Sequence, residues 1–211
     1  MMRRLVLAAG CLVLAAVWLG PLPSLAGGAF WAHMTMHMGV VAVAAPMLAL
    51  GIAGGRFDPA RRAPGLFAPI PASLLELAVV WAWHAPAPHH VARHSAAGLA
   101  AEQGMFLLAG LLLWLAAFGG VPGQGRRAAG VVGLLLTSMH MTLLGALLAL
   151  SPRPLYPHLH SSAGLTPLED QHLGGAIMLL AGGASYLLGG LWLTAGLLRD
   201  RRLEPAGEGA P

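Results

Sequence analysis

Six apolar stretches, each near 20 residues, limit the folds that this sequence can adopt. A helix of about 20 residues crosses the roughly 30 Å hydrocarbon core of a bilayer. Charged residues make up only 9% of the chain, against roughly 25% in ordinary soluble domains. These features predict an integral membrane protein built from helices. The stretches are residues 5–20, 30–51, 66–84, 98–118, 129–150 and 172–198.

The first stretch has features of a secretory signal peptide and of a membrane anchor. The charged leader MMRR precedes an apolar core, and Ser24 and Ala26 have the small-residue spacing of a cleavage site. In either case residue 27 lies outside, and five crossings follow. We therefore expect an all-α, polytopic transmembrane helical bundle of five spans over residues 27–200. A signal peptide or N-terminal anchor at 1–26 precedes it, and a short cytoplasmic tail at 201–211 follows.

The arginines predict the orientation of this bundle. All 12 basic residues are arginine, and most of them fall in the segments that this topology places inside, as the positive-inside rule requires. The basic surplus therefore reflects topology and not nucleic-acid binding, because no basic stripe with interleaved aromatic residues is present. We expect a cytoplasmic C-terminus. The inside residues are Arg3, Arg4, Arg56, Arg61, Arg62, Arg126, Arg127, Arg199, Arg201 and Arg202.

The histidines collect on the opposite side. His33 and His37, in HMTMHM, stand one helical turn apart, with side chains about 5–6 Å from each other, and Met34 and Met36 flank the same arc. Imidazole and thioether donors together suit copper, particularly Cu(I). The alternative is a pair of histidines tolerated at the interface, with methionine as apolar filler. The outer histidines are His33, His37, His84, His89, His90, His94, His158, His160 and His172.

Two further histidines are candidates for the same site. His140, in SMHM, lies about ten residues from either end of its stretch, where an unpartnered imidazole is costly. It needs either a hydrogen-bond partner on a facing helix or a role as third imidazole beside His33 and His37. His84, in WAWH, ends its span just before a proline-rich break, where a ligand role competes with that of an ordinary interfacial histidine.

Other polar residues have structural interpretations. His90 and His94 fit the solvated face of a short surface helix. Thr166 and Glu169 form a capping box at the start of the last span. Asp170 lies in the first turn, where the helix dipole favours a carboxylate, and that role competes with a ligand role.

Enzyme motifs are absent from the sequence. It contains no HExxH, GxSxG or P-loop pattern. Cys11 is the only cysteine, so a metal must be held by histidine, methionine or carboxylate side chains. Glu76 and Glu102 lie within spans and must be paired, protonated or turned to a polar interior. We expect a protein that is not an enzyme and has no catalytic residues.

Four motifs in order carry a family resemblance: HMTMHM, WAWHAP, LLLTSMHMTLLGALLALSPRPLY and LTPLEDQHLGG. Together they resemble the CtaG-type cytochrome c oxidase assembly factor family of bacterial membrane proteins, over residues 30–195. The resemblance implies a protein of the bacterial inner membrane, with its histidine-rich side facing the periplasm, that handles copper for the catalytic subunit of the oxidase. It implies as partners the cytochrome c oxidase subunits, a copper donor protein and the lipid bilayer, and no nucleic acid.

The resemblance also implies a set of metal-site residues. Many relatives have Glu-His where this chain has Glu102 and Gln103. If that histidine is a ligand in those relatives, the site here has one fewer nitrogen donor. Two other functions stay open: a membrane haem or quinone oxidoreductase, in which facing histidines ligate iron, and a scaffold without metal. The family's HMxxH-type, WHxP, HM and DQ elements fall on His33, Met34 and His37, on Trp83, His84 and Pro86, on His140 and Met141, and on Asp170 and Gln171.

Overall fold

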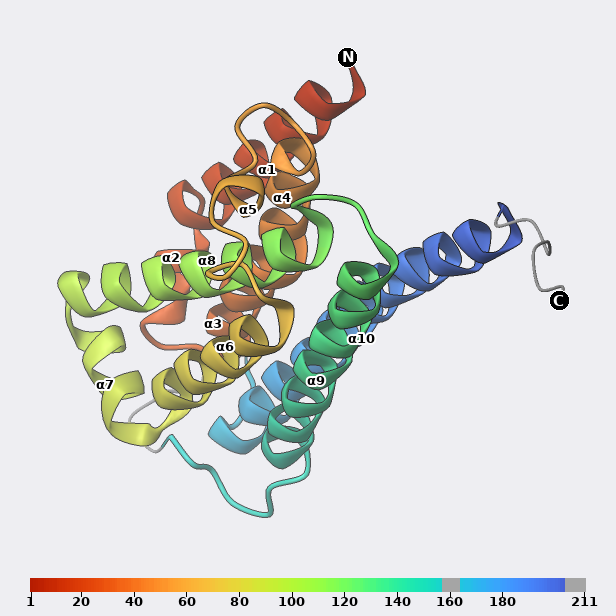
Figure 1. Ribbon diagram of the computed structural model, residues 1–211. Helices are drawn as coiled ribbons and strands as arrows, with labels where there is room; N and C mark the ends of the chain where they lie inside the picture. Colours follow the sequence, from red (N-terminus) through yellow and green to blue (C-terminus); the bar gives the residue numbers. More distant parts are fainter. Residues whose placement is uncertain (157–163, 204–211) are drawn as a thin grey trace, which may run out of the picture.

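The computed structural model of the protein describes residues 1–156 and 164–203, so His158 and His160 lie outside the described residues. Every regular element in the described residues is a helix, which confirms the all-α prediction. Figure 1 shows them as one bundle. The elements are α1 (Met2–Leu19), α2 (Leu22–Ala26), α3 (Phe30–Met38), the π-helix η1 (Gly39–Ala44), α4 (Ala45–Ile52), α5 (Pro59–Arg62), α6 (Pro69–His84), α7 (Pro86–His94), α8 (Ala96–Phe118), α9 (Gln124–Ala149) and α10 (Pro167–Leu203).

Five helical segments of the described chain are long and apolar enough to cross a bilayer. The span predicted at residues 66–84 is shorter than expected. Its helix, α6, has 16 residues, which at a rise of 1.5 Å per residue is about 24 Å. Proline sets both limits, since Pro69 occupies the first helical position and Pro86 stands two residues after His84, the last residue of the helix. The long segments are Met2–Leu19, Phe30–Ile52, Ala96–Phe118, Gln124–Ala149 and Pro167–Asp200.

Close helix contacts through glycine hold the bundle together. A Cβ at Gly175 of α10 would lie 2.5 Å from the backbone nitrogen of Ala149 in α9. Likewise, a Cβ at Gly51 of α4 would lie 2.8 Å from the Cβ of Leu7 in α1. Small residues at such positions let helix backbones approach closely within a membrane. The N-terminal helix therefore packs as part of the bundle (Figure 1).

A π-helical turn interrupts the span formed by α3, η1 and α4. Pro46 has no N–H to donate to the carbonyl of Ala42, four residues earlier. The Ser185 hydroxyl of α10 donates to that carbonyl at 2.7 Å. The Trp114 indole of α8 donates to the neighbouring Val41 carbonyl at 2.9 Å. Both carbonyls are thus paired, as a hydrocarbon environment demands, and these bonds tie η1 to two neighbouring helices.

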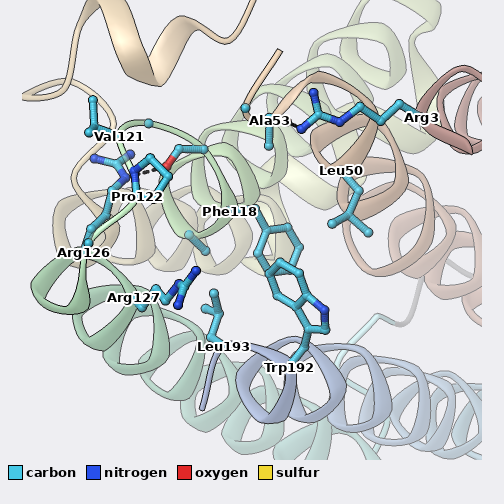
Figure 2. A pocket seen from close by; sticks show the side chains of 15 residues that line it. Arg3, Leu50, Ala53, Phe118, Val121, Pro122, Arg126, Arg127, Trp192 and Leu193 are labelled. Carbon is cyan, nitrogen blue, oxygen red and sulfur yellow. Dashed lines mark hydrogen bonds between the residues drawn. The ribbon is translucent and has the colours of Figure 1, made fainter. Parts of the chain in front are cut away.

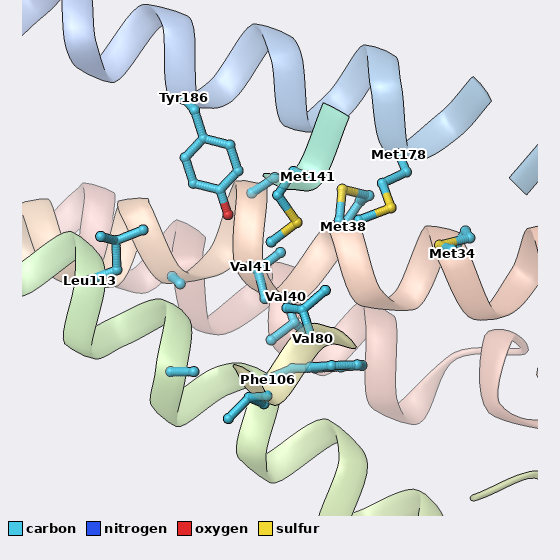
Figure 3. Close-up of a cluster of buried hydrophobic side chains, with 14 of the residues drawn as sticks. Met34, Met38, Val40, Val41, Val80, Phe106, Leu113, Met141, Met178 and Tyr186 are labelled. Carbon is cyan, nitrogen blue, oxygen red and sulfur yellow. The ribbon is translucent and has the colours of Figure 1, made fainter. Parts of the chain in front are cut away.

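Methionines fill the core on the α9 and α10 side of α3. Figure 3 shows Met38, Met141 and Met178 close together, with Tyr186 further along α10, the helix that carries Met178. All four side chains are fully buried. The flexible thioethers fill the irregular space between the three helices.

The two ends of the bundle carry different side chains. The start of α1, the short helix α5 and the loop from α8 to α9 lie at one end, and α7 lies at the other (Figure 1). We call these the arginine end and the histidine end. The arginine end carries Arg3, Arg4, Arg56, Arg61, Arg62, Arg126 and Arg127, and α7 carries His89, His90 and His94.

Candidate metal site

Four imidazoles meet at the histidine end. His33 and His37 come from successive turns of α3, His84 ends α6, and His89 comes from α7. The ring centroid of His84 lies 5.3 Å from that of His33 and 5.1 Å from that of His37. The His89 ring meets the His33 ring edge-on at 4.9 Å. All four are buried, with at most 5% of each residue exposed. We call this group the imidazole cluster.

Several nitrogens of the cluster have no hydrogen-bond partner within the described residues. Both ring nitrogens of His33 and of His37 are unpaired there, as is Nε2 of His84. The other nitrogen of His84, Nδ1, lies 2.7 Å from the carbonyl oxygen of Val80 and donates to it. Buried polar atoms are nearly always paired, and exceptions indicate function or a bound ion or water. The cluster therefore offers buried nitrogen donors that the fold itself does not use.

The four rings lie close together, but their nitrogens are not arranged around one common position. In the part of the chain that the structure describes, no group of three or more His, Cys, Asp or Glu side chains is placed to hold a metal ion. The His33 and His37 rings stack almost parallel, with an interplanar angle of 9° and centroids 6.4 Å apart. A shared ion would require these rings to turn about their side-chain bonds.

An ion pair lies beside the cluster. Glu102 of α8 pairs with Arg93 of α7, and both side chains are buried. The same carboxylate oxygen lies 3.6 Å from Nδ1 of His33 and accepts a 3.2 Å hydrogen bond from the Gln103 amide. The Trp18 indole in turn donates to Gln103 at 3.2 Å. The predicted need of Glu102 for a partner is thus met, and its carboxylate is fixed next to one imidazole.

Tyr156 covers the cluster from the loop after α9. Its ring packs against His89 at 4.3 Å and stacks on Phe30 at 4.8 Å. Its hydroxyl donates a 2.6 Å hydrogen bond to the His84 carbonyl. Burial raises the pKa of the Tyr156 hydroxyl well above its usual range, so this group stays a donor. The loop thereby fixes the end of α6 and the His89 ring together.

Asp170 and Gln171 connect helices near the site. The two carboxylate oxygens of Asp170 accept 2.8 Å bonds from the backbone N–H groups of Phe30 and Trp31, so α10 caps α3. The Gln171 side-chain amide accepts a hydrogen bond from the Leu155 N–H and donates one to the Leu148 carbonyl. Their polar atoms are thus engaged with backbone, and both residues position the elements that carry the imidazoles.

The capping box predicted at the start of α10 is confirmed. The Glu169 carboxylate accepts from the Thr166 N–H at 2.8 Å, and the Thr166 hydroxyl accepts from the Glu169 N–H at 3.3 Å. This exposed pair satisfies the orphan N–H groups of the first turn.

The two methionines of the predicted set pack on the other face of α3. A Cβ at Gly174 of α10 would lie 3.1 Å from Cγ of Met34, and Met141 lies beside Met38 (Figure 3). Met34 and Met141 therefore contact α10 and the methionine core, away from the imidazole rings.

His140 lies deeper in the bundle, on α9. It is 6% exposed, and neither of its ring nitrogens has a hydrogen-bond partner within the described residues. Its ring is close enough to His37 for the two to interact electrostatically. The structure thus brings His140 toward the cluster without ring stacking.

Sequence reasoning missed His89. The i, i+4 pair His90 and His94 led us to interpret this segment as a solvated surface helix, and their rings stack, at 4.0 Å, on the exposed face of α7. His89 lies on the buried face with Ala92, three residues away and thus on the same side of a helix. The apolar residue three positions after His89 was the feature of the sequence that could have indicated a buried His89.

Comparison with known families identifies the chain. The model of the family described as cytochrome c oxidase caa3 assembly factor matches residues 1–200. Comparisons with curated proteins and with solved structures gave no match. The family match covers nearly the whole chain, including α1, the imidazole cluster and α10. The chain therefore belongs to the cytochrome c oxidase caa3 assembly factor family.

Proposed function

We propose that this protein assists cytochrome c oxidase assembly by holding Cu(I) transiently at the imidazole cluster and passing it to the oxidase. The observation that carries the proposal is a set of buried ring nitrogens, both of His33, both of His37 and Nε2 of His84, that have no hydrogen-bond partner among the described residues. Copper is the cargo, and neutral imidazole is among the ligands that bind it. Transfer by ligand exchange breaks the copper–imidazole coordination bonds on this protein and forms new ones on the oxidase, and the copper stays Cu(I). Such a transfer requires no catalytic residues, which agrees with the absence of enzyme motifs from the sequence.

The proposed ligands are His33, His37 and His84, with His89 as a fourth donor. The Glu102 carboxylate, 3.6 Å from Nδ1 of His33, would accept a hydrogen bond from that nitrogen and leave Nε2 for the metal. Carboxylates commonly orient metal-binding histidines in this way. Met34, Met141, Asp170 and Gln171 have other contacts and are assigned to support the site.

The proposed orientation places the arginine end in the cytoplasm and the histidine end on the outer, periplasmic side. It is supported by the separation of arginines and histidines along the bundle and by the preference of cytoplasmic segments for basic residues. A copper donor protein would then approach from the periplasm, near α7.

A binding experiment tests the copper site. Purified protein in detergent is titrated with Cu(I) under anaerobic conditions against a chromogenic chelator, and the bound ion is examined by X-ray absorption. We expect about one ion with nitrogen ligands, in accord with the affinity of imidazole for copper. His33→Ala/His37→Ala should abolish binding, and His89→Ala should weaken it by roughly 10–100-fold, the usual effect of disturbing a ligand environment.

The matched control is His90→Ala/His94→Ala, which removes two stacked histidines at the same i, i+4 spacing from the exposed face of α7. This control should bind copper like the original protein. Equal binding by His33→Ala/His37→Ala would refute the proposed site.

An assembly experiment separates copper delivery from scaffolding. The same variants are expressed in cells that make a caa3-type oxidase and lack their own assembly factor, and membrane oxidase activity and copper content are measured. Variants without copper binding should restore little activity unless copper is added in excess. Full restoration at ordinary copper levels would favour a scaffold without metal.

A further inference from the structure

A cavity of about 360 Å³ lies at the arginine end, opposite the imidazole cluster. It is enclosed by the start of α1, the ends of α4 and α8, the following loop, the start of α9, and α10. Figure 2 shows Arg3, Arg126 and Arg127 around it, with the rings of Phe118 and Trp192 between them. The two rings meet edge-on, with centroids 5.2 Å apart.

Positive charge around this cavity exceeds negative charge. Arg127 forms an ion pair with Asp200. Within the described residues, Arg3 and Arg126 have no carboxylate partner and donate to backbone carbonyls instead. Arg3 bonds the Ala53 carbonyl at 2.6 Å, so the guanidinium groups are held in place before a ligand arrives.

The buried Asp58 carboxylate also lies at the cavity wall, where it accepts from the backbone N–H groups of Gly54 and Gly120. Three guanidinium groups thus face two carboxylates, and the cavity keeps one surplus positive charge.

An apolar groove continues from the cavity along the bundle. Leu50, Phe118 and Trp192 line both the first cavity and a second one of about 250 Å³. The second cavity extends past Trp114 and Leu188 between α4, α8 and α10. The cationic cavity and the apolar groove are thus adjacent and share these three lining residues.

We propose that the cavity and groove bind one anionic phospholipid. Its phosphate would lie among the guanidinium groups, and one acyl chain would pass over Phe118 and Trp192 into the groove. Arginine is suited to phosphate because its planar fork donates two parallel hydrogen bonds. Basic pockets between transmembrane helices bind anionic headgroups in this way. A free phosphate ion would use the arginines but not the groove, so the pair of features specifies an amphiphile.

Lipid retention tests the proposal. The full-length protein is exchanged from detergent into nanodiscs of phosphatidylcholine containing a small share of phosphatidylglycerol, and bound lipids are counted by native mass spectrometry. We expect phosphatidylglycerol to be retained in preference to phosphatidylcholine. Because an arginine near an anionic surface contributes about 1 kcal/mol, Arg3→Gln should weaken retention roughly 5-fold, and Arg3→Gln/Arg127→Gln about 25-fold.

The matched control is Arg4→Gln/Arg61→Gln, which removes two exposed arginines from the same end without touching the cavity. It should retain the lipid like the original protein. Arg126 is left in place because it bonds three backbone carbonyls. Arg3→Gln is informative as a single variant, because Arg3 has no carboxylate partner among the described residues that its loss would leave without a counter-charge. Equal retention by the double cavity variant, or equal binding of phosphatidylcholine, would overturn the proposal.

A second readout distinguishes a lipid from a soluble anion. Phosphatidylglycerol with brominated acyl chains should quench tryptophan fluorescence, and Trp192→Phe should remove a part of the quenching that Trp83→Phe, at the other end, does not. Protection of the protein against thermal unfolding by inorganic phosphate alone, with no quenching at Trp192, would assign the cavity to a free anion and reject the lipid.

Discussion

A buried ion pair lies beside the imidazole cluster of the candidate site. Arg93 and Glu102 come from different helices and are both removed from water. Their opposite charges cancel within the pair. Breaking such a pair by removing one partner leaves an uncompensated buried charge. The pair therefore couples the stability of the α7–α8 corner to the position of His33.

At the residue scale, Glu102→Gln should lower the free energy of unfolding by about 3–5 kcal/mol, because Arg93 remains buried without a counter-charge. Arg93→Gln/Glu102→Gln should recover much of that loss, since no lone charge is left. Thermal and denaturant unfolding in detergent micelles measures both. A double variant as unstable as Glu102→Gln would mean that the charge balance is not the stabilising feature.

Sequence reasoning found part of the site at this scale. His33, His37 and His84 follow from their motifs and from the topology, and the structure brings their rings together. His89 and the Arg93–Glu102 pair were not predicted, because they depend on how α7 folds back over α3 and α8. Helical periodicity orders residues within one helix and gives no information on such a turn between helices.

The interrupted span formed by α3, η1 and α4 shows how one element is supported by others. Pro46, nine residues after His37, removes a backbone hydrogen bond from this span, and the Ser185 hydroxyl supplies a replacement donor. The apolar stretch at 30–51 predicted one continuous span. The π-helix was not predicted, because its partners lie far away in the sequence, on α8 and α10.

At the element scale, Ser185→Ala should cost about 1–3 kcal/mol of stability, because the Ala42 carbonyl loses its donor in an apolar environment. The double variant Pro46→Ala/Ser185→Ala should lose less stability than Ser185→Ala alone, because the alanine N–H at position 46 can donate to the Ala42 carbonyl within the helix. Unfolding in micelles provides the comparison. If the double variant is no more stable than Ser185→Ala, the π-helix does not depend on Pro46.

The control for this pair is Thr194→Ala. The Thr194 hydroxyl donates to the Gly190 carbonyl within the same helix. A carbonyl inside a helix also accepts the regular backbone hydrogen bond, so it does not depend on this hydroxyl. Its loss should change stability by no more than about 0.5 kcal/mol.

The whole molecule has a chemical polarity along its axis, with arginines at one end and buried imidazoles at the other. The six apolar stretches predicted the bundle and the arginines predicted its direction. The length of α6 was overestimated because residues 66–68 are apolar, whereas the helix begins only at Pro69. Apolarity alone does not locate a helix start.

At the scale of the whole molecule, single cysteines in a Cys11→Ser background should report the orientation. His94→Cys, exposed on α7, should react with a membrane-impermeant maleimide in intact spheroplasts. Arg62→Cys, exposed on α5, should react only after permeabilisation. The positive-inside rule is the physical reason. The reverse labelling pattern would invert the proposed topology and separate the imidazole cluster from a periplasmic copper donor.

The shortness of α6 has a consequence for the lipid around the protein. A helix of about 24 Å is mismatched to a hydrocarbon layer of roughly 30 Å, and a bilayer responds to such a mismatch by thinning locally. Because α6 ends at His84, the membrane surface should dip beside the imidazole cluster. An ion arriving from the aqueous side would then cross only a thin layer, and a neighbouring membrane subunit could receive it through the same depression.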